Sequence, residues 1–477
     1  MRFISTRGGE KVTGDMAVSK GIAANGGLFV PEKLPVLSDA EMDDMLDKSF
    51  PERTAKIFRK FFSEVDEGKL LSALEEEYSH FEGDDPAPLV RVDDGVYMLE
   101  LFHGPTASSK DMAVAPLPYM LNGMTEKITV VAATSGDLGK SALECFKDRK
   151  NFKVLVFYPN DGLSKMQKLQ LVTQEGKNSS VVGVKGSFDD CHDGVKNALA
   201  SGAPVVCANS INFASLAPRI AYYFSAYLDL LSSEQIEKGE EVDFFIPSGN
   251  LGEVVGAYYS KLMGLPIRKI HLATNENNSL VSFFNTGVFE RAGEIVKTTS
   301  PSMDIAAPSD LERLIFEISG RDSRLTAKRM ASLASEGRYS LTHDELIRLN
   351  ETFDCGCANE ETCVEAMYDV FIDTGYTMDT CTGCAMKVAH DWYEKNKKDE
   401  TKAVIVAIDS PYKFPQDVLY AVTGNDVKDS FKGVKRLHDA TAMSIPNCVK
   451  NLRDKPVIFT KIIDKKGIVA EINEFLK

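Results

Sequence analysis

The stretch Ile128-Thr-Val-Val-Ala-Ala-Thr134, which continues as Ser135-Gly-Asp-Leu-Gly139, decides the fold. Its first part is an apolar, β-branched run of the kind that forms buried strands, and its glycines mark a tight turn. A helical pattern over 140–147 follows directly. A buried strand that leads through a glycine turn into a helix is the building unit of an α/β protein with a parallel sheet.

Similar apolar runs recur along the chain and alternate with helical patterns. The expected strands are Lys153–Tyr158, Val242–Ile246, Lys269–Ala273 and Ala403–Ile408, and the expected helices include Phe213–Leu231 and Val254–Met263. This alternation predicts an α/β architecture with largely parallel sheets. Two loops, 134–139 and 249–253, join a strand to a helix through glycines. Such a turn can bind a phosphate or a carboxylate through backbone N–H groups, although ordinary β–α turns share the pattern.

The length of 477 residues exceeds what one core supports and predicts several domains. Residues 1–90 have helical periodicity and end at the linker Asp84-Asp-Pro-Ala-Pro. Residues 91–420 would form the α/β core, and residues 421–477 a C-terminal extension of mixed character. We therefore expect a mainly helical N-terminal domain, a core and an extension.

Composition excludes several classes of partner and compartment. The formal net charge of −15 disfavours binding to nucleic acid or to anionic membranes. No apolar run is long enough for a membrane helix, and the N-terminal residues lack a secretory signal, so we expect a cytoplasmic protein. The nine cysteines are then expected to be thiols.

Two cysteine pairs, Cys355-Gly-Cys357 and Cys381-Thr-Gly-Cys384, raise the question of a zinc site. The C-x-C spacing of the first pair and the absence of a histidine at ligand spacing favour ordinary packing instead. A redox role for the second pair lacks a thioredoxin-like strand before it. We expect no metal.

A lysine, Lys110, follows the segment Phe102-His-Gly-Pro-Thr106, and alone it would be read as a solvated cation. Together with other motifs in the same order, however, this segment resembles the lysine motif of the threonine synthase family, F-H-G-P-T-x-A-F-K-D. The further matching motifs are Ala133-Thr-Ser-Gly-Asp137, Asn209-Ser-Ile-Asn212, Pro247-Ser-Gly-Asn-Leu-Gly252, Pro301-Ser-Met-Asp-Ile305 and Pro411-Tyr-Lys-Phe414. The resemblance spans nearly the whole chain.

The resemblance implies a fold type II enzyme that uses pyridoxal 5′-phosphate (PLP), similar to tryptophan synthase β, with two α/β lobes and a helical N-terminal domain. It implies that Lys110 holds the cofactor as a Schiff base and then moves protons. The implied cofactor-binding residues are Lys110, Asp137, Gly249, Asn250, Leu251, Gly252, Glu253 and Ile408, and the implied substrate-binding residues are Thr134, Ser135, Gly136, Leu138, Asn212 and Arg219. The implied reaction converts O-phospho-L-homoserine and water to L-threonine and phosphate. The partner is then a small phospho-amino acid, and a homo-oligomer is compatible with this family.

Several residues depart from the family pattern at positions that should face the ligand. Leu138 replaces a threonine, Glu253 an asparagine, Ser215 an arginine and Cys381 a histidine. Ser108-Ser109 replaces Ala-Phe, Ile408-Asp409 replaces Thr-Ala, and Arg219 stands where the family has glutamine. Two alternatives therefore stay open: a PLP-dependent lyase acting on another amino acid, and a protein that keeps the fold without catalysis.

Overall fold

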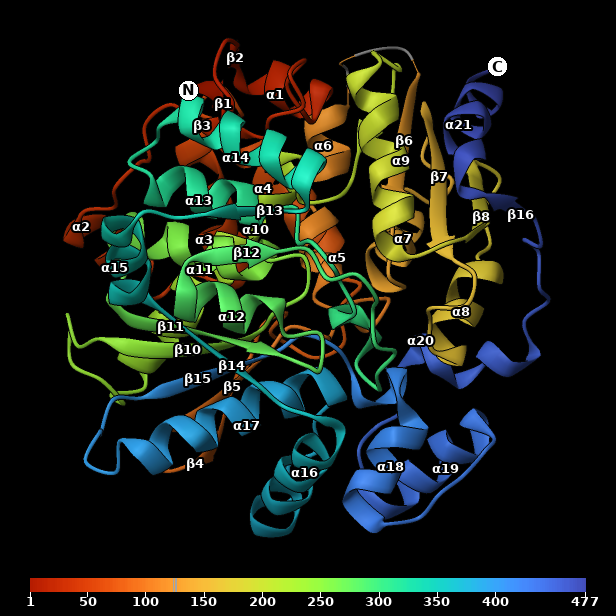
Figure 1. Ribbon diagram of the computed structural model, residues 1–477. Helices are drawn as coiled ribbons and strands as arrows, with labels where there is room; N and C mark the ends of the chain where they lie inside the picture. The colour runs from red at the N-terminus through yellow and green to blue at the C-terminus, as the bar shows by residue number, and fades with distance from the viewer. Residues whose placement is uncertain (123, 125–126) are drawn as a thin grey trace.

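The computed structural model describes residues 1–122, 124 and 127–477, and within these residues the chain forms two large sheets flanked by helices (Figure 1). One sheet has five strands in the order β16-β8-β7-β6-β9, and the other has six in the order β14-β11-β10-β15-β5-β4. Each sheet forms the centre of one α/β lobe. The predicted fold class is confirmed.

The five-stranded sheet is parallel throughout. Its strands are β6 (Ile128–Ala133), β7 (Phe152–Pro159), β8 (Ser179–Lys185), β9 (Val206–Cys207) and β16 (Ile462–Asp464). The flanking helices are α7 (Asp137–Cys145), α8 (Lys165–Val172) and α9 (Phe188–Ala200). β6 is buried at every residue, as its run of apolar side chains predicts.

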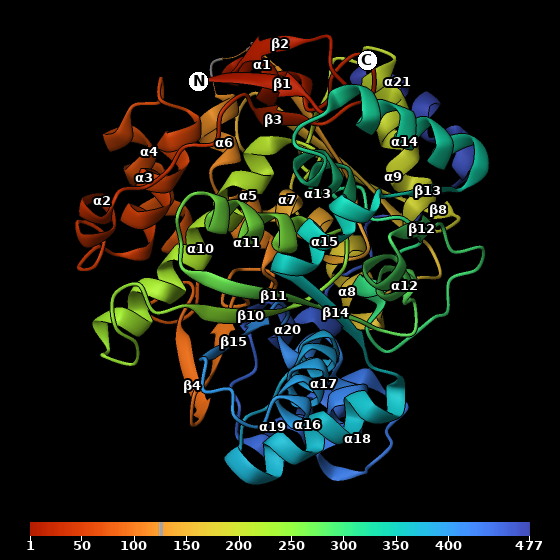
Figure 2. The ribbon, with the colours of Figure 1, turned by 60° about the vertical axis from the view of Figure 1, so that its left-hand side comes forward.

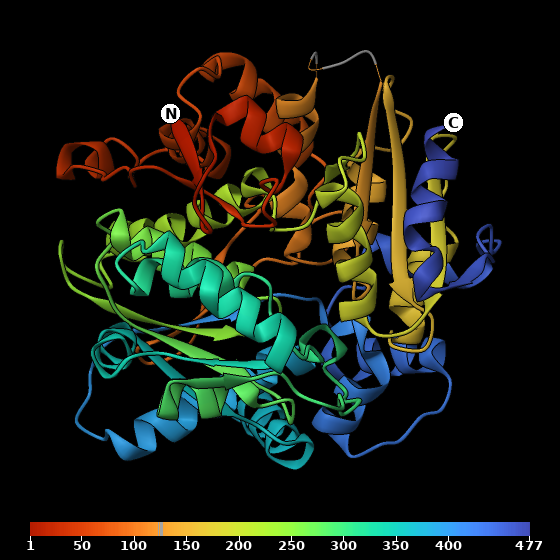
Figure 3. The same ribbon diagram turned by 45° about the horizontal axis from the view of Figure 1, so that its top comes forward.

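The C-terminal residues complete this lobe. β16 pairs in parallel with β8, and helix α21 (Ile468–Leu476) packs beside α9. Figure 3 shows the C-terminal helix, in dark blue, beside the strands of this lobe. Ile468 and Ile472 of α21 are fully buried in the core between helix and sheet. The helices α18 (Pro415–Thr423), α19 (Ser430–Thr441) and α20 (Asn447–Lys450) precede them. The division into domains at residues 90 and 420 stays a prediction.

The six-stranded sheet is parallel except for its edge strand β4, which pairs antiparallel with β5. Its strands are β4 (Leu89–Asp93), β5 (Val96–Glu100), β10 (Val242–Pro247), β11 (Ile267–Thr274), β14 (Phe353–Cys357) and β15 (Ala403–Ala407). The helices that matter for the site are α5 (Lys110–Val114), α10 (Phe213–Ser232), α11 (Gly252–Leu262) and α17 (Thr380–Lys395).

The remaining elements surround this second lobe. They are α6 (Leu117–Leu121), α12 (Ser279–Thr286), α13 (Leu311–Ile318), α14 (Ser323–Glu336), α15 (His343–Thr352), α16 (Glu360–Thr374) and the hairpin strands β12 (Val288–Glu290) and β13 (Arg338–Ser340). Among the residues that the structure describes, no helix is both long and apolar enough to span a bilayer.

The N-terminal segment combines helices with a small sheet (Figure 2). Helices α1 (Gly14–Lys20), α2 (Asp39–Asp43), α3 (Phe50–Phe61) and α4 (Glu67–Tyr78) accompany the antiparallel strands β1 (Arg2–Ser5), β2 (Lys11–Thr13) and β3 (Phe29–Pro31). Sequence analysis predicted the helical character but not these strands. Strands of three or four residues are too short to show the alternation of apolar and polar residues that identifies a strand.

The structure confirms the strands that the sequence predicted in the two lobes and moves the starts of two helices. Helix α11 begins at Gly252, two residues before the expected start at Val254. Helix α7 begins at Asp137, three residues before the expected start at Lys140. The reason is Gly136, whose φ of 130° ends the turn early and lets the helix begin at once. The loop that was expected to run over 134–139 is therefore half helix, and its last N–H groups belong to a helix N-terminus.

Candidate active site

A cavity between the two lobes brings most of the predicted site residues together. They come from the N-terminus of α5, the two glycine-containing loops, α10 and the end of β15. The described residues that line the cavity are Lys110, Ala133, Thr134, Ser135, Leu138, Phe188, Asn209, Ser210, Arg219, Pro247, Gly249, Asn250, Gly252, Glu253, Ser302, Ile305 and Ile408. The carboxyl ends of parallel strands thus meet at this point, as expected for ligand sites in α/β sheets.

Lys110 is the amine in this cavity. Its Nζ forms an ion pair with the Glu253 carboxylate and lies 3.4 Å from the hydroxyl of Ser109. The Lys110 side chain is 20% exposed, whereas Glu253 is buried. Lys110 directly follows the segment that pairs with the end of β15, since Ser109 N donates to Ile408 O at 2.7 Å. This backbone hydrogen bond therefore fixes where the lysine begins relative to the end of β15.

Arg219 from α10 forms an ion pair with the same oxygen of Glu253 that Lys110 contacts. Burial alone would raise the pKa of the Glu253 carboxyl, but Arg219 and Lys110 outweigh burial and lower this pKa to about 2. Glu253 is therefore ionised at neutral pH. Two cations and one anion leave this group with one net positive charge, which suits an anionic ligand.

The loop of residues 249–252 lines the cavity and leads into helix α11. A Cβ atom at Gly249 would lie 2.8 Å from the carbonyl oxygen of Ser302, so only glycine fits there. Leu251 has a φ of 63°, and Gly252 then begins α11, whose N-terminus adjoins the cavity. Asn250 Oδ1 accepts hydrogen bonds from the backbone and hydroxyl of Ser309, at 2.8 and 2.9 Å. This loop and helix end fit the phosphate group of PLP.

The loop that follows β6 is the second anion-binding candidate. Thr134 Oγ1 accepts a hydrogen bond from Gly136 N at 2.9 Å, and a Cβ atom at Gly136 would meet the Gln167 side chain at 2.7 Å. Leu138 is buried and lines the cavity where the family pattern has a hydroxyl. The loop therefore offers backbone N–H groups and the side chains of Thr134 and Ser135 to a ligand, and one apolar surface.

Four predicted residues lie outside the cavity lining, all in described parts of the chain. Gly136 shapes its loop, and Leu251 is buried in the core. Asn212 is the N-cap of α10: its Oδ1 accepts from Ala214 N, and its amide donates to the carbonyls of Val18 and Cys207. Because N-cap asparagines are common, a sequence motif cannot separate this role from ligand binding.

Asp137 is held by three partners behind the loop. Its carboxylate forms an ion pair with Lys413 at 2.7 Å and accepts hydrogen bonds from Gln167 at 2.7 Å and from Ser302 at 3.1 Å. Burial would lower the pKa of Lys413, but Asp137 and Asp409 raise it, so Lys413 is a buried cation. Lys413 belongs to the motif Pro411–Phe414 and Ser302 to the motif Pro301–Ile305, and the sequence alone predicted no role for either residue.

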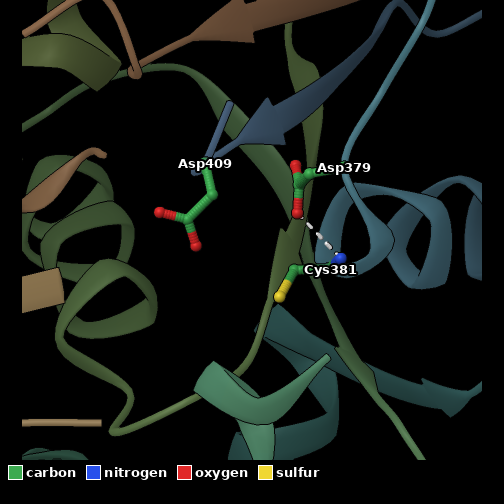
Figure 4. Close-up of side chains that lie close together, drawn as sticks. All are labelled: Asp379, Cys381 and Asp409. Carbon is green, nitrogen blue, oxygen red and sulfur yellow. Dashed lines mark hydrogen bonds between the residues drawn. The ribbon is translucent and has the colours of Figure 1, made fainter. Parts of the chain in front are cut away.

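Position 408 meets the cavity with an apolar side chain. Ile408 is buried, and the next residue, Asp409, extends away to a cluster with Asp379 and Cys381 at the N-terminus of α17 (Figure 4). The four cysteines of the two sequence pairs lie on β14 and α17, and all nine cysteines of the chain are free. Burial raises the pKa of the Cys381 thiol, and the carboxyl groups of Asp379 and Asp409 raise it further.

Comparison with known proteins identifies the family. Residues 2–78 match the model of the threonine synthase N terminus, and residues 83–409 match that of pyridoxal-phosphate dependent enzymes. A threonine synthase of Pseudomonas aeruginosa is 31% identical, over 89% of this chain and 91% of the relative.

Two solved structures agree with this result. The PLP-bound threonine synthase from Brucella melitensis has a TM-score of 0.84 and 29% identity, covering 100% of this chain and 99% of that one. The yeast threonine synthase has a TM-score of 0.85 and 27% identity, covering 100% and 98%. The resemblance found in the sequence is confirmed: this chain belongs to the threonine synthase family of pyridoxal-phosphate dependent enzymes.

Proposed function

We propose that this enzyme converts O-phospho-L-homoserine and water to L-threonine and phosphate. The observation that carries the proposal is the position of Lys110, whose amine lies in a cavity that both glycine-containing loops line. The reaction needs one amine and binding sites for the phosphate and carboxylate groups of the cofactor and substrate. The cavity offers the amine of Lys110 and two loops that can bind anions. Relatives that carry the name threonine synthase, at about 30% identity over most of the chain, support the same reaction.

The residues of this chain divide the binding work between two loops. We assign the cofactor phosphate to the 249–252 loop and the N-terminus of α11, because this glycine-containing turn leads directly into a helix N-terminus at the cavity. We assign the substrate carboxylate to the loop of Thr134, Ser135 and the first turn of α7. Pyridoxal 5′-phosphate, when bound, supplies an electron sink for the loss of protons from carbon.

Lys110 holds the cofactor through Nζ and moves protons at the substrate carbons. Glu253 does not act as the base that takes a proton from Lys110, because a carboxyl group with a pKa near 2 is a very weak base at neutral pH. It acts instead as the fixed negative charge that positions the lysine amine. Arg219 in turn holds Glu253, and its guanidinium carbon would lie 3.3 Å from a Cβ at Gly252 of the phosphate loop.

The substrate phosphate needs a cationic site, and Arg219 is an arginine that lines the cavity. Ser215 has replaced the family arginine one turn earlier on α10, so Arg219 restores a guanidinium to the same helix. We therefore propose that Arg219 supplies positive charge for phosphate groups in this cavity, and that its ion pair with Glu253 holds the guanidinium in position. We also propose a role in threonine biosynthesis in the cytoplasm, which the nine free thiols support.

The test is product analysis with purified protein, PLP and O-phospho-L-homoserine. We expect threonine and phosphate in equal amounts, and no product from the Lys110→Ala variant. Release of phosphate without threonine, or no release above that variant, would contradict the proposal. A PLP-dependent lyase acting on another amino acid is the second candidate, favoured by the apolar Leu138 in the carboxylate loop. It predicts turnover of another amino acid and none of O-phospho-L-homoserine.

A further inference from the structure

Three buried side chains, two from the start of α17 and one from the residues that follow β15, lie close together. Asp379, Cys381 and Asp409 each offer one ligand atom, and these atoms lie within 4.8 Å of one another. All three residues are at most 2% exposed. Figure 4 shows their carboxyl and thiol groups around a common space. The sequence could not show this set, because its members belong to two different elements.

Asp409 carries the observation that points to a ligand. Among the described residues, no hydrogen-bond partner reaches its buried Oδ1 atom. The charge of the buried Lys413 acts on Asp409 from a distance, but its direct contacts are to other groups: its Nζ lies 2.7 Å from Asp137 and donates to Gln170 at 2.7 Å. A buried carboxylate oxygen without a partner is unfavourable, because water no longer solvates its charge, unless a proton or a cation neutralises it.

Asp379 is already held in a ligand-like orientation. Its Oδ1 accepts hydrogen bonds from the backbone N–H groups of Cys381, at 2.8 Å, and Thr382, at 3.3 Å, and its Oδ2 accepts from the Thr382 hydroxyl. Metal-bound carboxylates are commonly fixed by hydrogen bonds of this kind. Asp379 is thus held in place, and its Oδ2, which accepts a single hydrogen bond, keeps a lone pair that can point into the cluster.

Two departures from the family pattern create this cluster together. Cys381 stands where the pattern has histidine, and Asp409 stands where it has alanine. The changes are 28 positions apart in the sequence but their side chains meet in space. Independent drift at two positions does not require them to meet. The two changes together remove the histidine of the family pattern and place a thiol, Cys381, and a carboxylate, Asp409, beside Asp379.

We propose that Asp379, Cys381 and Asp409 form a binding site for a divalent cation of the zinc class. One thiolate with two carboxylates suits a borderline-soft cation and leaves a fourth position for water. A tetrahedral zinc whose ligands lie about 2.0–2.3 Å away keeps these ligands roughly 3.3–3.8 Å apart. The three ligand atoms lie within 4.8 Å of one another, so a bound zinc would draw them closer by about 1–1.5 Å at most, chiefly by rotation of the Asp409 side chain.

The site would tie two parts of the catalytic core together. Asp409 pairs with Ser108 in an isolated antiparallel bridge, and Ser410 N donates to Ala107 O at 3.1 Å, so this segment holds the chain just before Lys110. Asp379 and Cys381 start α17, which packs on β10 and β15. A bound cation would therefore fix the lysine segment against α17, without contacting the substrate.

The test is zinc analysis of the purified holoenzyme after equilibrium dialysis against Zn²⁺. We expect about one zinc per chain in the wild type and in Cys384→Ser, a control that changes another buried thiol of α17. Loss of an outer-sphere partner weakens metal binding about 10- to 100-fold, so loss of a direct ligand in Cys381→Ala or Asp409→Ala should weaken it at least about 100-fold. Asp409→Ala restores the residue of the family pattern.

X-ray absorption at the zinc edge of the wild type decides the matter even if a variant fails to fold. It should show one sulfur at about 2.3 Å and oxygen ligands at about 2.0 Å. No zinc in the wild type, zinc retained in both variants, or two or more sulfur ligands would overturn the proposal. None of these readouts depends on the reaction that the enzyme catalyses.

Discussion

The Arg219 guanidinium and the Glu253 carboxylate form a buried ion pair beside the loop of residues 249–252. The family pattern has glutamine and asparagine at these two positions, so the chain has gained both charges together. A buried carboxylate beside a phosphate loop would be unfavourable alone. The arginine makes it tolerable, and the pair then holds the amine of Lys110 in place.

Removing one member of the pair should destabilise the protein strongly. In Glu253→Gln, Arg219 keeps its charge in a buried site without an anion, and such a loss costs about 3–5 kcal/mol of the free energy of unfolding. Denaturant unfolding measures this change. The control is Asp439→Asn, which breaks the exposed Lys435–Asp439 pair and should cost less than about 1 kcal/mol. Equal effects of the two variants would show that the buried pair has no special role.

Restoring both family residues should be milder than the sum of the single changes. Arg219→Gln with Glu253→Asn removes both charges and leaves no unpaired one. We expect the double variant to be more stable than additivity predicts by about 0.5–3 kcal/mol, measured as a double-mutant cycle. Simple additivity would mean that Arg219 and Glu253 do not depend on each other.

The stabilisation from Glu253 should disappear in acid. The pKa of Glu253 is lowered from an ordinary value of 4.5 to about 2 in the folded protein. A lowered pKa stabilises the fold above pH 4.5, and this contribution is lost as the pH falls from 4.5 toward 2. The difference in unfolding free energy between the wild type and Glu253→Gln should therefore shrink over that window. A difference that stays constant down to pH 2 would contradict the assigned ionisation.

The phosphate loop should not tolerate a side chain at Gly249. The added methyl group of Gly249→Ala would meet the Ser302 carbonyl oxygen at 2.8 Å and displace the loop. Overpacking of about 1–3 kcal/mol predicts roughly 5- to 150-fold weaker PLP binding, measured by titration of the apoenzyme. Gly293→Ala is the matched control, because no atom lies within 4 Å of its added Cβ. Unchanged PLP binding in Gly249→Ala would place the cofactor phosphate elsewhere.

Position 408 offers a test of the cofactor ring. The resemblance includes Ile408 among the cofactor-binding residues, at a position where the family has threonine, and an isoleucine side chain offers the cofactor no hydrogen bond. Ile408→Thr restores a hydroxyl donor, which should strengthen PLP binding by about 1–3 kcal/mol, or about 5- to 150-fold. Ile408→Val has nearly the same shape as threonine without the hydroxyl, and should not strengthen binding. If valine and threonine act alike, the hydroxyl has no partner at this position.

The sequence predicted the parts of the site that depend on local patterns. β6 and β10 carry long buried apolar runs, and the loops after them carry glycines, so strands and loops could both be placed. Ion pairs between residues far apart in the sequence leave no local pattern, so they could not be predicted: Lys110 and Glu253 are 143 positions apart. Asn212 shows the opposite limit, because its motif fits ligand binding and the structure uses its side chain as a helix cap.

The central claim is that Lys110 is the amine that holds the cofactor. Reduction of the PLP-loaded protein with borohydride, followed by proteolysis and mass spectrometry of the peptides, tests it directly. The account predicts a stable phosphopyridoxyl group on Lys110 alone, and none on the Lys110→Ala variant treated in the same way. A group attached to any other lysine, or no attachment to the wild type at all, would contradict it.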